Sequence, residues 1–318
     1  MTPPCAVITG VGHALPPTIV TNHDLAARLD TTDEWIRTRS GIHQRHIAPP
    51  GTGTADLAVE AGSRALASAE TDAVDLLIVT TSTADRPCPA TAPAVATRLG
   101  LGPVPAFDLD AVCSGFLYGL TTSVAMITSG LFDSVLLVAA DTFSRLVDDD
   151  DRATAFLFGD GAGAVVLRRG EAGEHGAVLD VGIGSDGSQE DLITVPDHRS
   201  HFTMQGPTVY RQAVASMSDG ARRTMTAVGW TVDDVDWFVG HQANQRIIDA
   251  VAGRLGLKPD RAISNVAHVG NTASASIPLA LSEAAADGRL QPGNRVVLAA
   301  FGGGATWGSA ALTWPALG

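Results

Sequence analysis

Two long stretches without a charged residue, one in each half of the chain, limit the folds that this sequence can adopt. The first covers residues 111–132 and is long enough to cross a bilayer. Asp110 and Asp133 bracket it, no Lys or Arg flanks it, and it contains several serines, threonines and glycines. These features favour a helix buried on every face inside a globular protein over a membrane span. A second uncharged stretch, residues 262–281, predicts another such helix.

The two halves also share sequence patterns at a constant spacing. Residues 74–82 resemble residues 235–241, and residues 133–140 resemble residues 294–300, in both cases at a shift of 161 positions. Each of these segments is an apolar run of strand length. The matching order predicts an internal duplication.

Apolar strands that alternate with helical stretches predict an α/β fold in which helices cover the faces of the sheets. Residues 54–68 and 208–228 are two of the predicted helices. We expect the first half to span residues 1–168 and the second to span 169–318, joined by a turn at residues 170–174. Because each half buries one apolar helix, the two helices should pack together between two sheets.

Composition and charge exclude several classes of function. The formal net charge is −13 and the sequence pI is about 4.9, so neither nucleic acid nor an anionic membrane surface is an expected partner. Charged residues make up only 17% of the chain, which favours an oligomer that hides part of its surface. Three cysteines without CxxC spacing fit neither a disulfide framework nor a metal site, and no secretory signal begins the chain. A cytoplasmic location is therefore expected.

Cys113 stands between a strand-like segment and the first uncharged helix. A thiol at a helix amino terminus faces free N–H groups and the positive end of the helix dipole, which favour the thiolate. The sequence therefore predicts a nucleophile at Cys113. The alternative is a buried structural cysteine, which the position taken alone favours until the residues that complement the thiol are considered.

Two polar residues of the second half complement this thiol. His241 follows a predicted strand directly, and Asn271 stands at the start of the second uncharged helix, where the duplication is expected to make it the counterpart of Cys113. Packing of the two halves should bring all three side chains together. A structural histidine and a helix-capping asparagine are the alternative interpretations.

Glycine-rich segments occur at residues 158–167 and 301–308. Neither is a dinucleotide-binding fingerprint, because the glycines run into β-branched strand material instead of opening a helix. Close backbone packing and the presentation of an N–H to a reacting oxygen are both open as their use.

These motifs together resemble the β-ketoacyl-acyl-carrier-protein synthase III family of the thiolase superfamily. The resemblance covers the whole chain and is carried, in order, by Asp33-Glu34-Trp35-Ile36-Arg37-Thr38-Arg39-Ser40-Gly41-Ile42, Ala111-Val112-Cys113-Ser114-Gly115-Phe116, Phe158-Gly159-Asp160-Gly161-Ala162-Gly163-Ala164, His241-Gln242-Ala243-Asn244, Gly270-Asn271-Thr272-Ala273-Ser274-Ala275-Ser276-Ile277-Pro278 and Phe301-Gly302-Gly303-Gly304-Ala305-Thr306-Trp307-Gly308. It implies a thiolase-like duplicated fold of five layers, α-β-α-β-α, with two mixed sheets around a buried central helical layer.

The resemblance also implies an activity and a set of catalytic residues. Cys113 would accept an acyl group from an acyl-CoA, and His241 and Asn271 would assist the decarboxylative condensation with malonyl-acyl-carrier protein. The backbone N–H groups of Cys113 and Gly303 would form the oxyanion hole. No cofactor and no metal are implied, since the coenzyme A thioester is a substrate.

Binding residues follow from the same resemblance. Trp35, Arg39 and Arg152 would bind coenzyme A, whereas Pro207 replaces an asparagine that helps to hold the pantetheine arm in the family. The carrier protein would dock on basic residues, and one family lysine of that patch is a glycine here, Gly253; the basic residues are Arg211, Arg246 and Arg254. A homodimer is implied as well.

The acyl pocket is expected to include Phe158 and Cys88. In members that are specific for acetyl groups, a bulky aromatic residue of the dimer partner closes this pocket. Cys88 occupies that position in the present sequence, so the resemblance implies room for a longer acyl chain.

Two other functions compete with this one. An acyltransferase on the same scaffold would move the acyl group from Cys113 to a hydroxyl or an amine without condensation. A non-catalytic subunit of a heterodimeric synthase would lack the nucleophile. The presence of Cys113, His241 and Asn271 favours the condensing enzyme.

Overall fold

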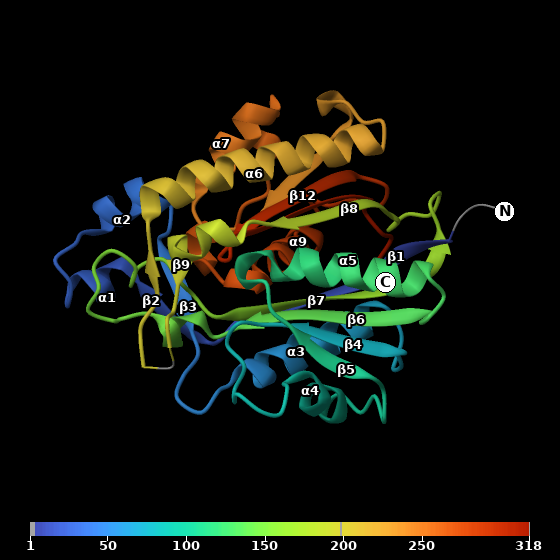
Figure 1. The fold of residues 1–318 in the computed structure, drawn as a ribbon, viewed down its shortest axis with the longest axis horizontal. Coiled ribbons are helices and arrows are strands. Elements are labelled where there is room, and N and C mark those ends of the chain that lie inside the picture. The colour runs from blue at the N-terminus through green and yellow to red at the C-terminus, as the bar shows by residue number, and fades with distance from the viewer. Residues whose placement is uncertain (1–3, 198, 318) are drawn as a thin grey trace.

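The computed structural model describes residues 4–197 and 199–317, and its first sheet is built from the first half of the chain. The order is β1-β7-β6-β4-β5 (Figure 1). Strand β4 pairs in parallel with β5 and β6, while β6-β7 and β7-β1 are antiparallel. The bounds are β1 Pro4–Ala14, β4 Leu76–Thr80, β5 Ala106–Leu109, β6 Ser134–Asp141 and β7 Gly161–Glu171.

The second sheet repeats this arrangement in the order β11-β12-β13-β8. Strands β11 and β12 are parallel, and β12-β13 and β13-β8 are antiparallel. A parallel bridge from Phe238 to Ala262 stands where β5 stands in the first sheet. The bounds are β8 Val178–Ser185, β11 Trp237–Gly240, β12 Arg295–Gly302 and β13 Thr306–Thr313. Two small ladders pair β2 (Thr18–Thr21) with β3 (Gln44–Ile47) and β9 (Ile193–Thr194) with β10 (Thr203–Met204).

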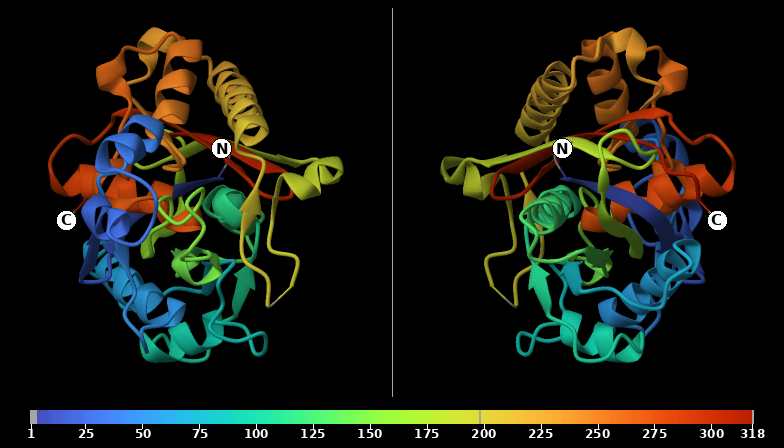
Figure 2. Two further views of the ribbon diagram at one scale, coloured as in Figure 1. Left: turned by 90° about the vertical axis from the view of Figure 1, so that its left-hand side faces the viewer. Right: turned by 90° about the vertical axis from the view of Figure 1, so that its right-hand side faces the viewer.

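Helices form the three remaining layers, so the predicted α-β-α-β-α architecture is confirmed (Figures 1 and 2). Helices α3 (Thr54–Ser68) and α4 (Ala92–Arg98) cover the outer face of the first sheet. Helices α5 (Gly115–Thr128) and α9 (Ser276–Ala286) lie between the sheets, and α6 (Gly206–Ala227) and α7 (Gln245–Leu255) cover the second sheet. The remaining helices are α1 Asn22–Ala26, α2 Asp33–Ser40 and α8 Val266–Val269, with 3₁₀ turns η1 Val112–Ser114, η2 Phe143–Leu146, η3 Gly187–Leu192, η4 Val232–Asp234, η5 Pro259–Arg261 and η6 Ala273–Ala275.

The first uncharged helix is less buried than its sequence predicted. Helix α5 is buried along one side, but Ala125 is exposed and Tyr118 and Val124 are half-buried, so the prediction of burial on every face is wrong for α5. The hydroxyl groups of its threonines and of Ser123 donate to carbonyls within the helix, for example Thr121 Oγ1 to the Leu117 carbonyl at 2.8 Å. Helix α9 is buried along most of its length.

The duplication is exact in register around the start of each central helix. Strand β6 and β12, turn η1 and η6, and the first residues of α5 and α9 all match at a shift of 161 positions. Val112 and Ala273 even share a positive φ, of 47° and 48°. The counterpart of Cys113 is therefore Ser274 and not Asn271, which corrects the sequence-based pairing by three residues.

The connection between the halves lies slightly beyond the predicted position. Strand β7 extends through Arg168 to Glu171, and the chain turns between Glu171 and Val178. The division into halves at residues 1–168 and 169–318 stays a proposal. Within the described residues, none of the helices combines the length and the apolar character that a bilayer crossing requires.

Candidate active site

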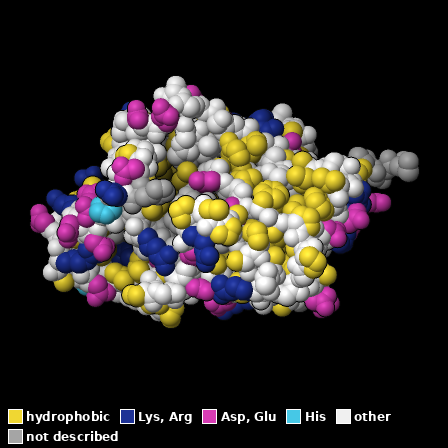
Figure 3. Space-filling model, turned by 60° about the horizontal axis from the view of Figure 1, so that its bottom comes forward, with side chains coloured by type: hydrophobic (Ala, Val, Ile, Leu, Met, Phe, Trp, Pro, Cys, Tyr) yellow, Lys and Arg dark blue, Asp and Glu magenta, His cyan; other side chains and the backbone are white. Residues whose placement is uncertain are grey.

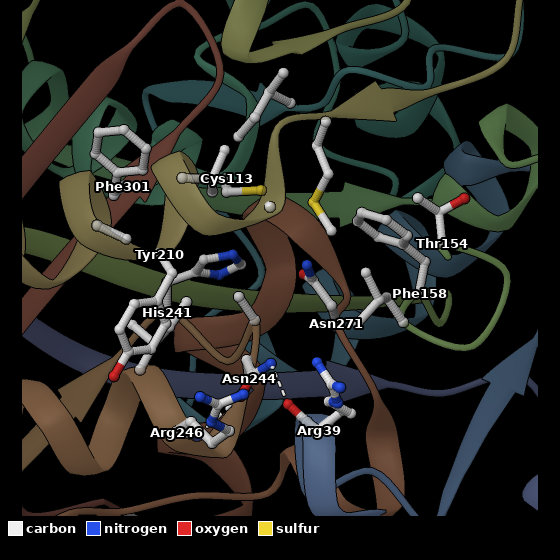
Figure 4. A pocket seen from close by; sticks show the side chains of 18 of the residues that line it. Arg39, Cys113, Thr154, Phe158, Tyr210, His241, Asn244, Arg246, Asn271 and Phe301 are labelled. Carbon is white, nitrogen blue, oxygen red and sulfur yellow. Dashed lines mark hydrogen bonds between the residues drawn. The ribbon is translucent and has the colours of Figure 1, made fainter. Parts of the chain in front are cut away.

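A cavity of about 680 Å³ opens at the junction of the two halves (Figure 4). Most of its lining is apolar and aromatic, which suits an organic ligand. The predicted site residues that line it are Trp35, Arg39, Cys113, Phe158, Arg211, His241, Arg246 and Asn271. Residues predicted from five separate sequence motifs thus share one cavity.

Cys113 lies in turn η1, where the chain leaves Val112 at a φ of 47° and enters α5. The thiol is 8% exposed and points into the cavity toward His241 and Asn271 (Figure 4). Burial raises the pKa of this thiol strongly, and the nearby carboxylates Asp141 and Asp110 raise it further. The expectation of a resting thiolate is therefore wrong, because the field of one helix terminus is smaller than the cost of desolvating a charged sulfur.

His241 follows β11 and reaches the cavity with one ring nitrogen. Its Nδ1 lies 2.7 Å from Ser276 Oγ, the first residue of α9, and that oxygen also accepts the Gln242 N–H at 3.3 Å. We assign the Ser276 hydroxyl as the donor and Nδ1 as the acceptor of this hydrogen bond. The proton of the neutral ring is then on Nε2, which faces the cavity as an N–H donor. Burial lowers the pKa of His241 to about 3, so the ring is neutral at physiological pH.

Asn271 is held by its backbone and by its own side-chain oxygen. Its N–H donates to the Leu157 carbonyl, and its carbonyl accepts the Gly159 N–H, each at 2.9 Å. Its Oδ1 accepts the Ala273 N–H at 2.9 Å. Because the carboxamide oxygen is engaged, the NH₂ group is the part of Asn271 available to the cavity as a donor.

Gly303 lies in the turn between β12 and β13, beside the nucleophile. Thr306 Oγ1 stands 3.1 Å from the Ala111 carbonyl and 3.0 Å from the Gly303 carbonyl, so one hydroxyl links the two loops. This link holds the turn that contains Gly303 against the residues that lead into η1.

The coenzyme A residues predicted from the family resemblance form one cluster at the mouth of the cavity. The guanidinium groups of Arg39 and Arg152 lie 5.4 and 5.0 Å from the Trp35 ring centre. Phe156 packs edge-on against the same ring. The cluster presents an aromatic face and two cations, which is suited to an adenine with its phosphates.

A contact between the two halves lies beside the mouth of the cavity. Asn244, the N-cap of α7, donates its side-chain N–H to the Arg39 carbonyl at 2.9 Å (Figure 4). Helix α2 lies beside α7 as a result (Figure 2). A side chain at Gly41, which ends α2 with a φ of 77°, would collide with Gln245. The close approach of the helices thus depends on glycine at this position.

The three predicted docking arginines lie on the outer helical layer. Arg211 and Arg246 line the cavity mouth, and the Arg246 guanidinium lies 5.6 Å from the Tyr210 ring centre. Arg254, in the last turn of α7, accepts a hydrogen bond from Arg222 on its carbonyl and does not line the cavity.

Two aromatic residues of one ring cluster, Phe158 and Phe202, line the cavity. Phe158 stacks on Phe143 at 4.5 Å, and Phe202 meets both rings edge-on. Cys88 lies outside this cavity, in an exposed loop of the same chain. Pro207 lines the cavity in the first turn of α6.

Two further residues matter to the site, although the sequence assigned them no role. Ser276 contacts the His241 ring, and its sequence signal is its place within the motif that begins at Gly270. Asn244 was part of the His241 motif, and its position as a helix N-cap could have indicated a structural role.

A duplicated five-layer fold with a cysteine at the start of one central helix, facing a histidine and an asparagine of the other half, defines an acyl-transferring enzyme of the thiolase class. Models of the 3-oxoacyl-[acyl-carrier-protein] synthase III family match residues 107–187, and models of its C-terminal part match residues 225–314. The chain belongs to the β-ketoacyl-acyl-carrier-protein synthase III family.

Individual relatives agree over the full length. The chain is 56% identical to β-ketoacyl-[acyl-carrier-protein] synthase III 2 of Streptomyces coelicolor, over 97% of this chain and 94% of the relative. The crystal structure of 3-oxoacyl-(acyl carrier protein) synthase III of Pseudomonas aeruginosa matches at a TM-score of 0.96 with 52% identity, over 99% of both chains. The priming β-ketosynthase of a polyketide biosynthetic pathway matches at a TM-score of 0.92 with 35% identity, over 98% of this chain and 96% of that one.

Proposed function

We propose that this enzyme joins an acyl group from acyl-CoA to malonyl-acyl-carrier protein by decarboxylative Claisen condensation, and so starts a fatty-acid or polyketide chain. The observation that carries the proposal is the convergence of one thiol and two neutral N–H donors on one apolar cavity. The enzyme is a ketosynthase III-type acyltransferase.

The first step loads the enzyme. Cys113 Sγ attacks the acyl-CoA carbonyl, a new C–S bond forms, and the bond from the carbonyl to the coenzyme A sulfur breaks. The thiol proton of Cys113 leaves with the departing coenzyme A thiol. The negative oxygen that develops on the carbonyl is stabilised by the backbone N–H groups of Cys113 and Gly303.

The second step makes the carbon–carbon bond. The malonyl group loses its carboxylate as CO₂, and the electron pair forms an enolate whose oxygen accepts hydrogen bonds from His241 Nε2 and the Asn271 NH₂ group. The enolate carbon attacks the acyl-Cys113 carbonyl, the C–S bond breaks, and the thiolate recovers a proton from solvent. Because burial lowers the pKa of His241, the ring is uncharged and acts in this step as a neutral hydrogen-bond donor, as the Asn271 NH₂ group does.

The alternative acyltransferase needs a general base that removes a proton from a hydroxyl or an amine. With the Ser276 hydroxyl assigned as donor to Nδ1, the proton-bearing Nε2 of His241 faces the cavity, and the ring meets the substrate as a donor and not as a base. This geometry favours condensation over simple acyl transfer.

Intact-mass spectrometry with a series of acyl-CoAs, followed by malonyl-acyl-carrier protein, tests the proposal. Wild type should gain one acyl group and then release a β-ketoacyl-carrier protein. Cys113→Ala should gain no acyl group. Asn271→Ala should be acylated within a few-fold of the wild-type rate, yet condense about 100-fold more slowly or worse. Acylated wild type that transfers its acyl group without loss of CO₂ would support the acyltransferase instead.

Both substrates approach through the arginine-rich mouth of the cavity. Trp35, Arg39 and Arg152 would hold the adenine and phosphates of coenzyme A. Arg211, Arg246 and Arg254 would offset the net charge of −13 for an acidic carrier protein. Proline at position 207 has neither a side-chain amide nor a backbone N–H, so the pantetheine arm would lack a contact there.

We propose that the enzyme is a homodimer and that the region around strand β5 forms its interface. Strand β5 is an open edge of its sheet, with Phe107 half-buried, and Leu131 near the end of α5 is 64% exposed. Figure 3 shows hydrophobic side chains gathered on the side of the molecule that turns forward from the bottom of Figure 1. Cys88, exposed in its own chain, would enter the acyl pocket of the dimer partner. We also propose that the enzyme is located in the cytoplasm.

A further inference from the structure

The internal duplication produces two equivalent positions at the centre of the molecule, and only one of them holds the nucleophile. Turn η1 carries Cys113 and contacts the end of β12, whereas η6 carries Ser274 and contacts the end of β6. The residue that ends β6 is Asp141, and the residue that ends β12 is Gly302. Each turn therefore faces the strand end of the opposite half.

At the Ser274 position, the strand-end side chain fills the space next to the turn. Asp141 is fully buried, and its Oδ2 accepts both the Ser274 N–H at 3.0 Å and the Ser274 hydroxyl. Its Oδ1 accepts the Ser82 N–H and the Thr83 hydroxyl, each at 2.9 Å. The N–H at the start of this central helix is thus permanently engaged by a carboxylate.

At the Cys113 position, the corresponding side chain is absent. A Cβ built on Gly302 would lie 2.9 Å from the Cys113 nitrogen and 3.0 Å from the Ser114 nitrogen. The Ser114 N–H already donates to the Ala111 carbonyl at 3.0 Å. The backbone N–H of Cys113 lowers the pKa of its own thiol, against the larger effect of burial. Because Gly302 has no side chain, the space next to the Cys113 N–H stays open. The carbonyl oxygen of an acyl group attacked by the sulfur could enter this space.

We propose that Gly302 is a positioning residue of the acylation step, which keeps the Cys113 N–H open to the carbonyl oxygen of the incoming acyl group, whereas its duplicate Asp141 closes the equivalent N–H of Ser274. The inference rests on the proposed function. The two matching helix starts thus differ in the strand end that faces them as well as in the nucleophile: one strand end carries a carboxylate and the other carries no side chain.

Substitution of Gly302 separates this role from a general role in packing. In Gly302→Ala, the added methyl group would press on the Cys113 N–H, so acylation by butyryl-CoA or octanoyl-CoA should slow about 100-fold or more. Alkylation of Cys113 by iodoacetamide forms no oxyanion, because the sulfur attacks a saturated carbon. Its rate, and the affinity for free coenzyme A, should stay within about three-fold of wild type.

The matched control is Gly173→Ala, because a Cβ at Gly173 in the turn between the halves would meet nothing within 4 Å. This control should acylate at the wild-type rate. Unchanged acylation in Gly302→Ala would overturn the inference, and so would a parallel fall of acylation and alkylation, because the glycine would then only hold the sulfur in place. A wild-type enzyme that no acyl-CoA acylates would refute the proposed function itself.

A second measurement covers the case in which Gly302→Ala does not fold. Wild type is loaded with an acyl group that carries ¹³C at its carbonyl, and the infrared carbonyl band is compared in the folded and the denatured acyl-enzyme. An open N–H next to the thioester should lower the band frequency in the folded protein. An equal frequency in both states would overturn the inference.

Discussion

The chemistry of single residues in this site is governed by burial. Cys113 and His241 were predicted from sequence, because a cysteine before an uncharged helix and a histidine after an apolar strand form a recognisable pattern. Their protonation states could not be predicted in that way. The pKa of Cys113 is raised and that of His241 is lowered by the surrounding protein, which both halves contribute only after folding. The resting pair is thus neutral.

This neutrality predicts an alkylation profile. The thiolate is the reactive species, and a raised pKa in the folded state moves its formation to higher pH than in the unfolded chain. In a Cys88→Ser background, iodoacetamide labelling of Cys113 should therefore rise about tenfold per pH unit from pH 7 through pH 9 without reaching a plateau. Denatured protein, measured by peptide mass spectrometry at the same pH values, should level off near the ordinary thiol pKa of roughly 8.5. A plateau below pH 8 in the folded enzyme would contradict the raised pKa.

Single elements show where sequence patterns suffice and where they do not. The helix predicted at residues 54–68 is α3, with the same bounds, because its amphipathic period is unbroken. The pairing of Asn271 with Cys113 failed because both residues precede an uncharged helix, and only the backbone reveals that η6 begins two residues after Asn271. The serine contact to His241 was likewise beyond sequence reasoning, since it joins two elements across the core.

Helix α7 carries a prediction for carrier-protein docking. Arg254 lies on this helix outside the cavity, so Arg254→Glu should raise the KM for malonyl-acyl-carrier protein about five- to tenfold, because an attractive charge becomes a repulsive one. Acylation by acyl-CoA should be unchanged, and the difference should shrink at high salt.

Arg98→Glu is the matched control, because Arg98 ends α4 on the opposite outer layer. It carries the same change of charge and should leave the KM for the carrier protein as in wild type. An equal rise in both variants would attribute the effect to net charge alone.

At the scale of the whole molecule, the sequence predicted the duplicated five-layer architecture but not the surfaces that remain open. The low charge fraction indicated an interface without locating it. The edge strand β5 and the partial exposure of α5 became visible only in the folded chain. The extent to which a helix with both apolar and hydroxyl side chains is buried cannot be predicted from its sequence. Thr and Ser hydroxyls donate to carbonyls of the same helix, so they fit a buried face and an exposed face equally well.

The proposed dimer predicts an effect of Cys88 on the partner's pocket. Cys88→Phe should shift the preference from longer acyl-CoAs toward acetyl-CoA by about tenfold or more in the ratio of kcat/KM values, because a larger wall excludes several carbons. The measurement compares acylation by acetyl- and octanoyl-CoA. Cys88→Ser retains the small side-chain volume and should keep the wild-type preference. An unaltered kcat/KM ratio in Cys88→Phe would show that Cys88 does not line the acyl pocket.

The hydrogen bond from Asn244 to the Arg39 carbonyl has a consequence for protein engineering. Chimaeras that join the first half of this enzyme to the second half of another synthase, spliced in the turn after Glu171, depend on a match across that seam. A second half taken from another synthase can form the same bond if it has an asparagine at the N-cap of the helix that corresponds to α7. The acceptor is the backbone carbonyl of residue 39, which is present whatever side chain stands there. Donor choice for such hybrids can thus begin from one side chain instead of the entire interface.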